Sequence, residues 1–102
     1  MSDVAYLGST TQRPDEDIAY TVDVSNVGSS PTVNDVKAYQ RSDGSDVSDT
    51  VLTGSATVSG DVITTPKVGS LTDAVTYQIE VNYTISGNVY EDMFEITCSD
   101  GR

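Results

Sequence analysis

The sequence predicts a single all-β domain, folded as a two-sheet antiparallel sandwich of about seven strands. Three observations predict it. Val, Thr, Ser and Tyr are frequent, whereas leucine occurs only at Leu7, Leu52 and Leu71, a composition that favours strands over helices. Short segments in which apolar and polar residues alternate recur along the chain, and no stretch has helical periodicity. A chain of 102 residues has room for one modest core.

The N-terminal part of the chain is expected to differ from the rest. Residues 1–16 are polar and contain Pro14, so we expect an N-terminal arm or edge strand there. From residue 17 the pattern changes to a period of two. "DIAYTVDV" places Ile18 and Val24 at the two ends of one apolar face, which predicts a half-buried strand. The sandwich is therefore expected over 17–98, followed by a tail over 99–102.

The middle of the chain predicts shorter strands joined by polar loops. One strand is expected over 33–41 and another around "TVLTG", with Gly-, Ser- and Asp-rich loops on either side. "SATVSGDVITTP" predicts a tight hairpin. With Gly60 and Asp61 at the turn, Val58 faces Ile63 across the two strands.

The last hairpin, which includes "VNYTISGNVYEDMFEITC", has the clearest alternation in the chain. A two-residue turn at Gly87 and Asn88 places nearly all apolar residues on one face, with Asp92 inside and Met93 outside. A slip by one residue would invert every side chain, so the faces are well specified. This register also sets Glu80 directly opposite Glu95 on the solvent face.

Two opposed carboxylates admit several interpretations. Their expected separation of about 5 Å is that of the carboxyl pair in retaining glycosidases. However, the sequence predicts no cleft, and it contains no Trp that could stack on a sugar. Salt would screen the repulsion between Glu80 and Glu95, and 12 Asp against 2 Lys suggest a halophilic or marine source. The alternatives are a solvated acidic face (Glu80, Glu91 and Glu95) that meets a basic partner, or a cation held between the two carboxylates.

The net charge of −11, from 16 acidic and 5 basic residues, argues against several partners. Nucleic acid and anionic membrane surfaces both require clustered Lys and Arg. No apolar run approaches a membrane-spanning length, and the start has no secretion-signal pattern. The single cysteine, Cys98, predicts a buried free thiol.

No catalytic or cofactor chemistry is expected. The chain has no His to activate a Ser or Cys nucleophile, and no glycine-rich phosphate loop. Asp43, Asp46 and Asp49 recur at intervals of three, which does not match the alternate ligand positions of a helix-loop-helix calcium loop. We therefore expect a solvated turn there, no metal or cofactor, no small-molecule substrate and no enzymatic activity.

Three apolar residues have no evident place in the expected core. They are Met93 on the outer face and Tyr6 and Leu7 in the N-terminal arm. We consider them candidate partner contacts, since an extended arm that adds to a neighbouring sheet is a recurring assembly device. Scattered exposed apolar residues are also ordinary on protein surfaces.

A turn motif refines the expected fold. "LTDAVTY" places Leu71 six residues before Tyr77, at the start of a long strand. It resembles the turn into the penultimate strand of fibronectin type III domains, where a Tyr hydroxyl bonds to nearby backbone. Asp73 and Ala74 stand where that family usually has Pro and Gly. The resemblance implies an immunoglobulin-like sandwich.

Two longer segments carry a wider resemblance. "RPDEDIAYTVDVS" and "SATVSGDVITTPKVGSLTDAVTYQIEVNYTISGN" resemble the small immunoglobulin-like structural proteins of tailed bacteriophages and tailed archaeal viruses, which decorate capsids or act as head-tail or fibre adaptors. The resemblance spans most of 13–98, but "VGSSPTVNDVKAYQRSDGSD" lacks the expected aromatic and Leu content. It implies a virion protein that binds other capsid, tail or fibre proteins, or copies of itself. The alternative is a cellular adhesin-like or carbohydrate-binding domain.

Overall fold

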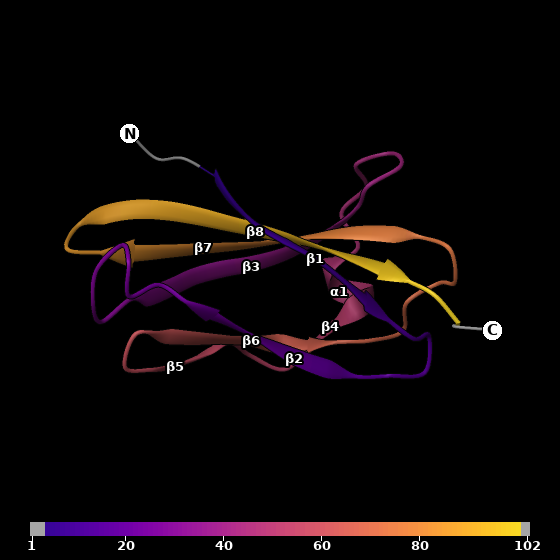
Figure 1. Cartoon of the computed structure of the whole chain (residues 1–102), viewed down its shortest axis with the longest axis horizontal. Helices are drawn as coiled ribbons and strands as arrows, with labels where there is room; N and C mark the ends of the chain where they lie inside the picture. Colours follow the sequence, from indigo (N-terminus) through magenta and orange to yellow (C-terminus); the bar gives the residue numbers. More distant parts are fainter. Residues whose placement is uncertain (1–3, 101–102) are drawn as a thin grey trace.

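The computed structural model describes residues 4–100, with side chains from residue 8 onward, and its two β-sheets pack face to face (Figure 1). The predicted β-sandwich is thereby confirmed. Sheet A has the strand order β1-β8-β7-β3, and sheet B has the order β2-β6-β4 with β5 also paired to β6. The elements are β1 (Val4–Gln12), β2 (Ile18–Asp23), β3 (Thr32–Gln40), α1 (Ser48–Val51), β4 (Leu52–Thr53), β5 (Thr57–Ser59), β6 (Val62–Val68), β7 (Thr76–Ile85) and β8 (Asn88–Cys98). No helix within residues 4–100 is long and apolar enough to span a membrane.

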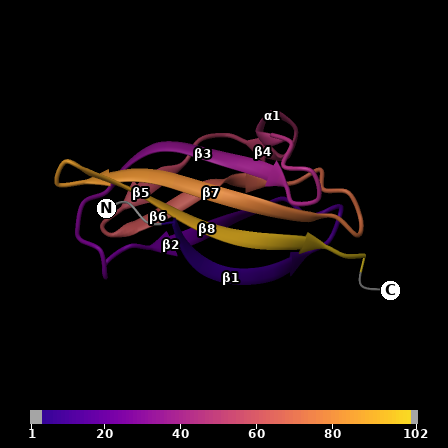
Figure 2. The same cartoon turned by 90° about the horizontal axis from the view of Figure 1, so that it is seen from above.

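Two local features differ from the expected purely antiparallel strands. Strand β1 pairs with β8 in parallel, from Val4 beside Glu91 to Gln12 beside Cys98. This direction brings the end of β1 to the place where residues 13–17 cross to β2 in the other sheet (Figure 2). The expected strand around "TVLTG" is instead the one-turn helix α1 followed by the two-residue strand β4.

The register predicted for the last hairpin was wrong by two residues. The turn lies at Ser86 and Gly87, so that Ile85 pairs with Asn88 and Tyr83 with Tyr90. Both turn residues have positive φ, 51° and 82°, as the two-residue hairpin turns that match strand twist require. A shift of two residues leaves every side chain on its predicted face, so the apolar pattern could not distinguish the two registers.

The core lies between the sheets and consists mainly of β-branched and aromatic side chains. Ile63 of β6 and Ile79, Tyr83 and Ile96 of β7 and β8 are fully buried. The predicted contact of Val58 with Ile63 is confirmed. Cys98 is buried as a free thiol, as predicted, and burial raises its pKa.

A buried polar network holds β1 and β2 together at one side of the sandwich. The Gln12 amide, 1% exposed, donates to the carbonyl oxygens of Glu16 (2.8 Å) and Val68 (2.7 Å). Its Oε1 accepts a 2.7 Å bond from the Tyr20 hydroxyl. Because every polar atom of this amide has a partner, its burial is compatible with stability. The expected N-terminal segment is thus an integral edge strand over residues 4–12.

The hydrogen bond between a Tyr hydroxyl and nearby backbone that the "LTDAVTY" resemblance implies, the tyrosine corner, is present. The Thr72 N–H donates to the Tyr77 hydroxyl at 2.9 Å. Ala74, in place of the usual Gly, adopts φ of 70°, a left-handed conformation that an L-residue adopts only with strain. The corner therefore forms without the glycine that usually adopts this positive φ without strain.

Candidate functional site

The outer face of sheet A carries the residues that the sequence singled out. Glu80 lies on β7, and Glu91, Met93 and Glu95 alternate along β8. The residues next to Glu80 on β7, and those between the three β8 residues, are buried, because side chains of a strand alternate between its two faces. We call Glu80, Glu91, Met93 and Glu95 the acidic face.

The predicted opposition of Glu80 and Glu95 does not occur. In the observed register Glu80 lies opposite Met93, and Glu95 lies opposite Gln78. Each carboxylate therefore faces a side chain of no charge across the strand pair. The error follows directly from the turn, which lies one residue earlier than predicted and so shifts the strand pairing by two residues.

A different pair of carboxylates comes together instead. Glu91 lies opposite Asn82, two residues along β7 from Glu80, and such diagonal neighbours remain within reach of long side chains. Burial and then the neighbouring Glu80 carboxylate raise the pKa of Glu91, with a hydrogen bond between the two groups favouring its protonated form. Glu80 also accepts a 2.7 Å bond from the Gln78 amide. The acidic face thus concentrates negative charge at Glu80 and Glu91.

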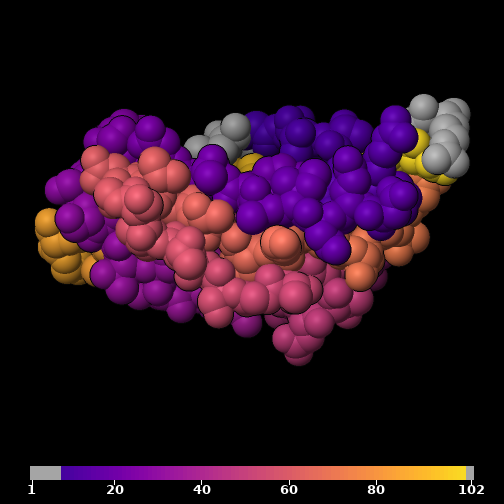
Figure 3. Space-filling view, turned by 90° about the horizontal axis from the view of Figure 1, so that it is seen from below, coloured from indigo at the N-terminus to yellow at the C-terminus, as the bar shows by residue number. Residues whose placement is uncertain are grey.

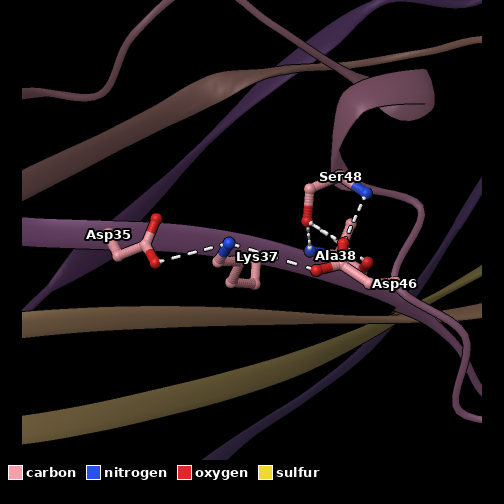
Figure 4. A network of polar contacts seen from close by, with 5 residues as sticks. All are labelled: Asp35, Lys37, Ala38, Asp46 and Ser48. Atoms are coloured by element: carbon pink, nitrogen blue, oxygen red, sulfur yellow. Dashed lines mark hydrogen bonds and ion pairs between the residues drawn. The ribbon is translucent and has the colours of Figure 1, made fainter.

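The nearby cations neutralise other carboxylates. Arg41 forms an ion pair with Glu95. Lys37 lies opposite Glu80 in the β3–β7 register, but its ammonium group lies 3.7 Å from Asp35 and 4.0 Å from Asp46 (Figure 4). Within residues 4–100, no Lys or Arg forms an ion pair with Glu80 or Glu91.

The apolar candidates belong to two neighbouring strands of sheet A, β1 and β8. Met93 is partly exposed, and Tyr6 of β1 is its registered neighbour in the parallel β1–β8 pair. Leu7 follows at a register shift between Tyr6 and Ser9. The side chains of Tyr6 and Leu7 lie outside the described part of the structure.

A polar hollow adjoins the acidic face on the β3 side. It has a volume of about 300 Å³ and is lined by Tyr39, Gln40, Arg41, Gly44, Gln78 and Glu80. Tyr39 and Gln78 were not predicted as site residues from the sequence. Tyr39 sits opposite Gln78 on the outer face, a position that strand alternation indicates only after β3 has been paired with β7.

Two of the three aspartates that recur at intervals of three, Asp43 and Asp46, cap local turns. Asp43 accepts bonds from the backbone N–H and hydroxyl of Ser45, and Asp46 accepts the same pair from Ser48. These hydrogen bonds lower the pKa of both carboxyl groups. Asp49 lies in the first turn of α1. Over residues 4–100, no group of three or more His, Cys, Asp or Glu residues is arranged to hold a metal ion.

Comparison with known proteins adds no relative from which a role could be transferred. No protein-family model matches the chain, and no curated protein and no solved structure is significantly similar to it.

Proposed function

We propose that this protein is a non-enzymatic structural component of a tailed virus, which binds other virion proteins through the acidic face. The observation that carries the binding role is the concentration of negative charge at Glu80 and Glu91, beside the partly exposed Met93, without an ion-paired Lys or Arg in the described chain. Such a surface complements a basic partner surface. The virion setting rests on the family resemblance alone.

The first test is quantitative mass spectrometry of purified particles from the source virus, with the shell protein as the reference. A copy number near that of the shell protein would identify a decoration protein. A few copies per particle would identify a connector or fibre adaptor. If the protein is absent from particles, the virion role is wrong.

A second test addresses the binding face. The double charge reversal Glu80→Lys with Glu91→Lys should lower incorporation into particles, because it removes the complementary charge. Asp15→Lys with Asp49→Lys makes the same change of net charge at two exposed carboxylates outside this face and is the control. Equal loss of incorporation in both variants would mean that net charge, rather than the acidic face, is recognised.

The polar hollow favours the alternative of a carbohydrate-binding domain. It combines the aromatic Tyr39 with amide, guanidinium and carboxylate groups from Gln78, Arg41 and Glu80, and small-molecule sites commonly combine aromatic rings with a few polar groups. A glycan array tests this alternative. A specific hit that is lost in Tyr39→Ala would place saccharide binding ahead of virion assembly.

A further inference from the structure

Half of the outer edge of β3 is closed by the loop that follows it. Ala38 and Gln40 direct their backbone groups away from β7: the Ala38 N–H donates to Ser48 Oγ at 2.9 Å (Figure 4), and the Gln40 N–H donates to the Ser45 carbonyl oxygen at 2.9 Å. The Val47 N–H donates to the Ala38 carbonyl oxygen, also at 2.9 Å. The loop thereby blocks this half of the edge against further strands.

The other half of this edge is open. Backbone groups of an antiparallel strand alternate in direction with a period of two. Val36, two residues before Ala38 and paired with Val81, therefore directs its N–H and C=O toward the same edge. Within residues 4–100 these two groups have no hydrogen-bond partner. The Val36 N–H and C=O are thus an unpaired donor and acceptor, to which a further strand could form hydrogen bonds.

A cleft lies directly beside this open edge. It has a volume of about 300 Å³, and its lining includes Val33, Asp35, Val36, Gly54, Ala56 and Pro66. It exists because β4 pairs only with residues 67–68 of β6, and β5 only with residues 62–64. Pro66 lies between the two pairings and has no N–H to donate to either. Sheet B is consequently interrupted opposite the open half of β3.

The cleft leaves inward-facing apolar side chains in contact with solvent. Val33 and Val36 are only partly buried, although they pack against the core. Val58 of β5 is 40% exposed, although its cross-strand partner Ile63 is fully buried. These valines belong to the inner faces of the two sheets, and nothing in the described chain covers them at this side of the sandwich. A strand added beside β3 would cover them.

We propose that an extended segment of a partner protein adds to the open edge of β3 as a fifth strand of sheet A. One row of its side chains would enter the cleft, which selects small apolar residues. The other row would lie on the outer face beside Asp35, whose side chain is 55% exposed. Asp35 already pairs with Lys37 at 3.7 Å, so the net charge of −11 on the chain, rather than this carboxylate alone, selects Lys or Arg. The occupant is therefore an alternating apolar and basic segment, and mutual repulsion disfavours a second copy of this chain.

This proposal goes beyond the proposed function, because it concerns a different surface from the acidic face. The test uses the whole protein, isotope-labelled, with the capped peptide acetyl-KVKVKVK-amide as the probe. Binding should shift the amide resonances of β3 and of residues 54–56. The control peptide acetyl-KPKPKPK-amide has the same charge, but proline cannot donate backbone hydrogen bonds. We expect it to bind about tenfold more weakly or not at all.

Two variants locate the binding. Val36→Pro removes the outward N–H without removing a bond to β7, and Val36→Thr is its matched control because it keeps that N–H. Ala56→Arg fills the cleft and adds a positive charge, and it keeps the test decisive if Val36→Pro does not fold. Both Val36→Pro and Ala56→Arg should weaken binding of the Val-Lys peptide by about tenfold, whereas Val36→Thr should leave it nearly unchanged.

Three outcomes would overturn the proposal: no binding of the Val-Lys peptide to the folded protein, equal binding of both peptides, or resonance shifts confined to the acidic face. The last two would mean that charge alone attracts the peptide. Val36→Pro and Ala56→Arg leave Glu80, Glu91 and Met93 intact. Failure at the β3 edge and failure of the acidic face to bind virion proteins are therefore separate results.

Discussion

Asp92 is the residue at which the core departs furthest from an apolar interior. It is 5% exposed, lies opposite Val81, and accepts a 3.1 Å bond from the Tyr83 hydroxyl. Burial raises the pKa of Asp92, although the bond from Tyr83 opposes this shift. A raised pKa in the folded state means that ionisation of Asp92 disfavours folding.

We expect Asp92→Asn to stabilise the protein at pH 7 by on the order of 1 kcal/mol, because Asn keeps an acceptor for Tyr83 without a charge to bury. The contribution of Asp92 to stability is fully present below the unfolded-state pKa of Asp and is lost as pH rises through its higher folded-state pKa. The two proteins should therefore converge near pH 3. Urea unfolding at both pH values measures this, with the exposed Asp15→Asn as a control. A difference that does not depend on pH would contradict the explanation.

The tyrosine corner gives a second prediction for a single residue. Tyr77→Phe deletes the hydroxyl that accepts the Thr72 N–H, so unfolding should become easier by about 1 kcal/mol. Tyr39→Phe removes a hydroxyl on the outer face and should change stability much less. If chemical denaturation gives the same loss for both variants, the corner does not stabilise the fold.

Among the elements, the β7–β8 hairpin shows how a turn decides which residues meet. Its two strands keep the same inner and outer faces under either register, whereas the partners of Glu80 and Glu95 change completely. Ser86 at φ of 51° and Gly87 at φ of 82° fix the turn. Asn followed by Gly is the sequence that favours such a turn most strongly.

Ser86→Asn should therefore stabilise the hairpin, by roughly 0.5 kcal/mol, since Asn tolerates positive φ better than Ser. Thermal or urea unfolding measures the change. Asn88→Ser is the control, because residue 88 belongs to β8 rather than to the turn. If Asn88→Ser lowers the free energy of unfolding and Ser86→Asn does not raise it, the turn lies at 87–88 instead.

At the scale of the whole molecule, unbalanced negative charge is the dominant property. The chain has sixteen acidic and five basic residues. At the acidic face, Arg41 forms an ion pair with Glu95 rather than with Glu80 or Glu91. Added salt screens such repulsion over a shorter distance. The molecule should thus be more stable in concentrated salt than in dilute buffer.

We expect the free energy of unfolding to rise between dilute buffer and about 1 M KCl. Glu80→Gln should flatten this dependence, because it removes the charge that raises the pKa of Glu91. Urea titrations at several salt concentrations measure both slopes, with Asp15→Asn again as the control. A wild-type stability that does not change with salt would remove the screening interpretation and, with it, support for a saline source.

The sequence by itself determined the β-sandwich, the inner and outer faces of its long strands, the buried thiol and the tyrosine corner. Each of these depends on local alternation or on a short motif, which the chain carries within a few residues. Only the tertiary structure decided the pairing of Glu80 with Glu91, the parallel docking of β1, and the open edge at Val36 beside Pro66. These depend on a turn whose two registers preserve the same faces, and on contacts between strands far apart in the chain. Local periodicity contains no information on either.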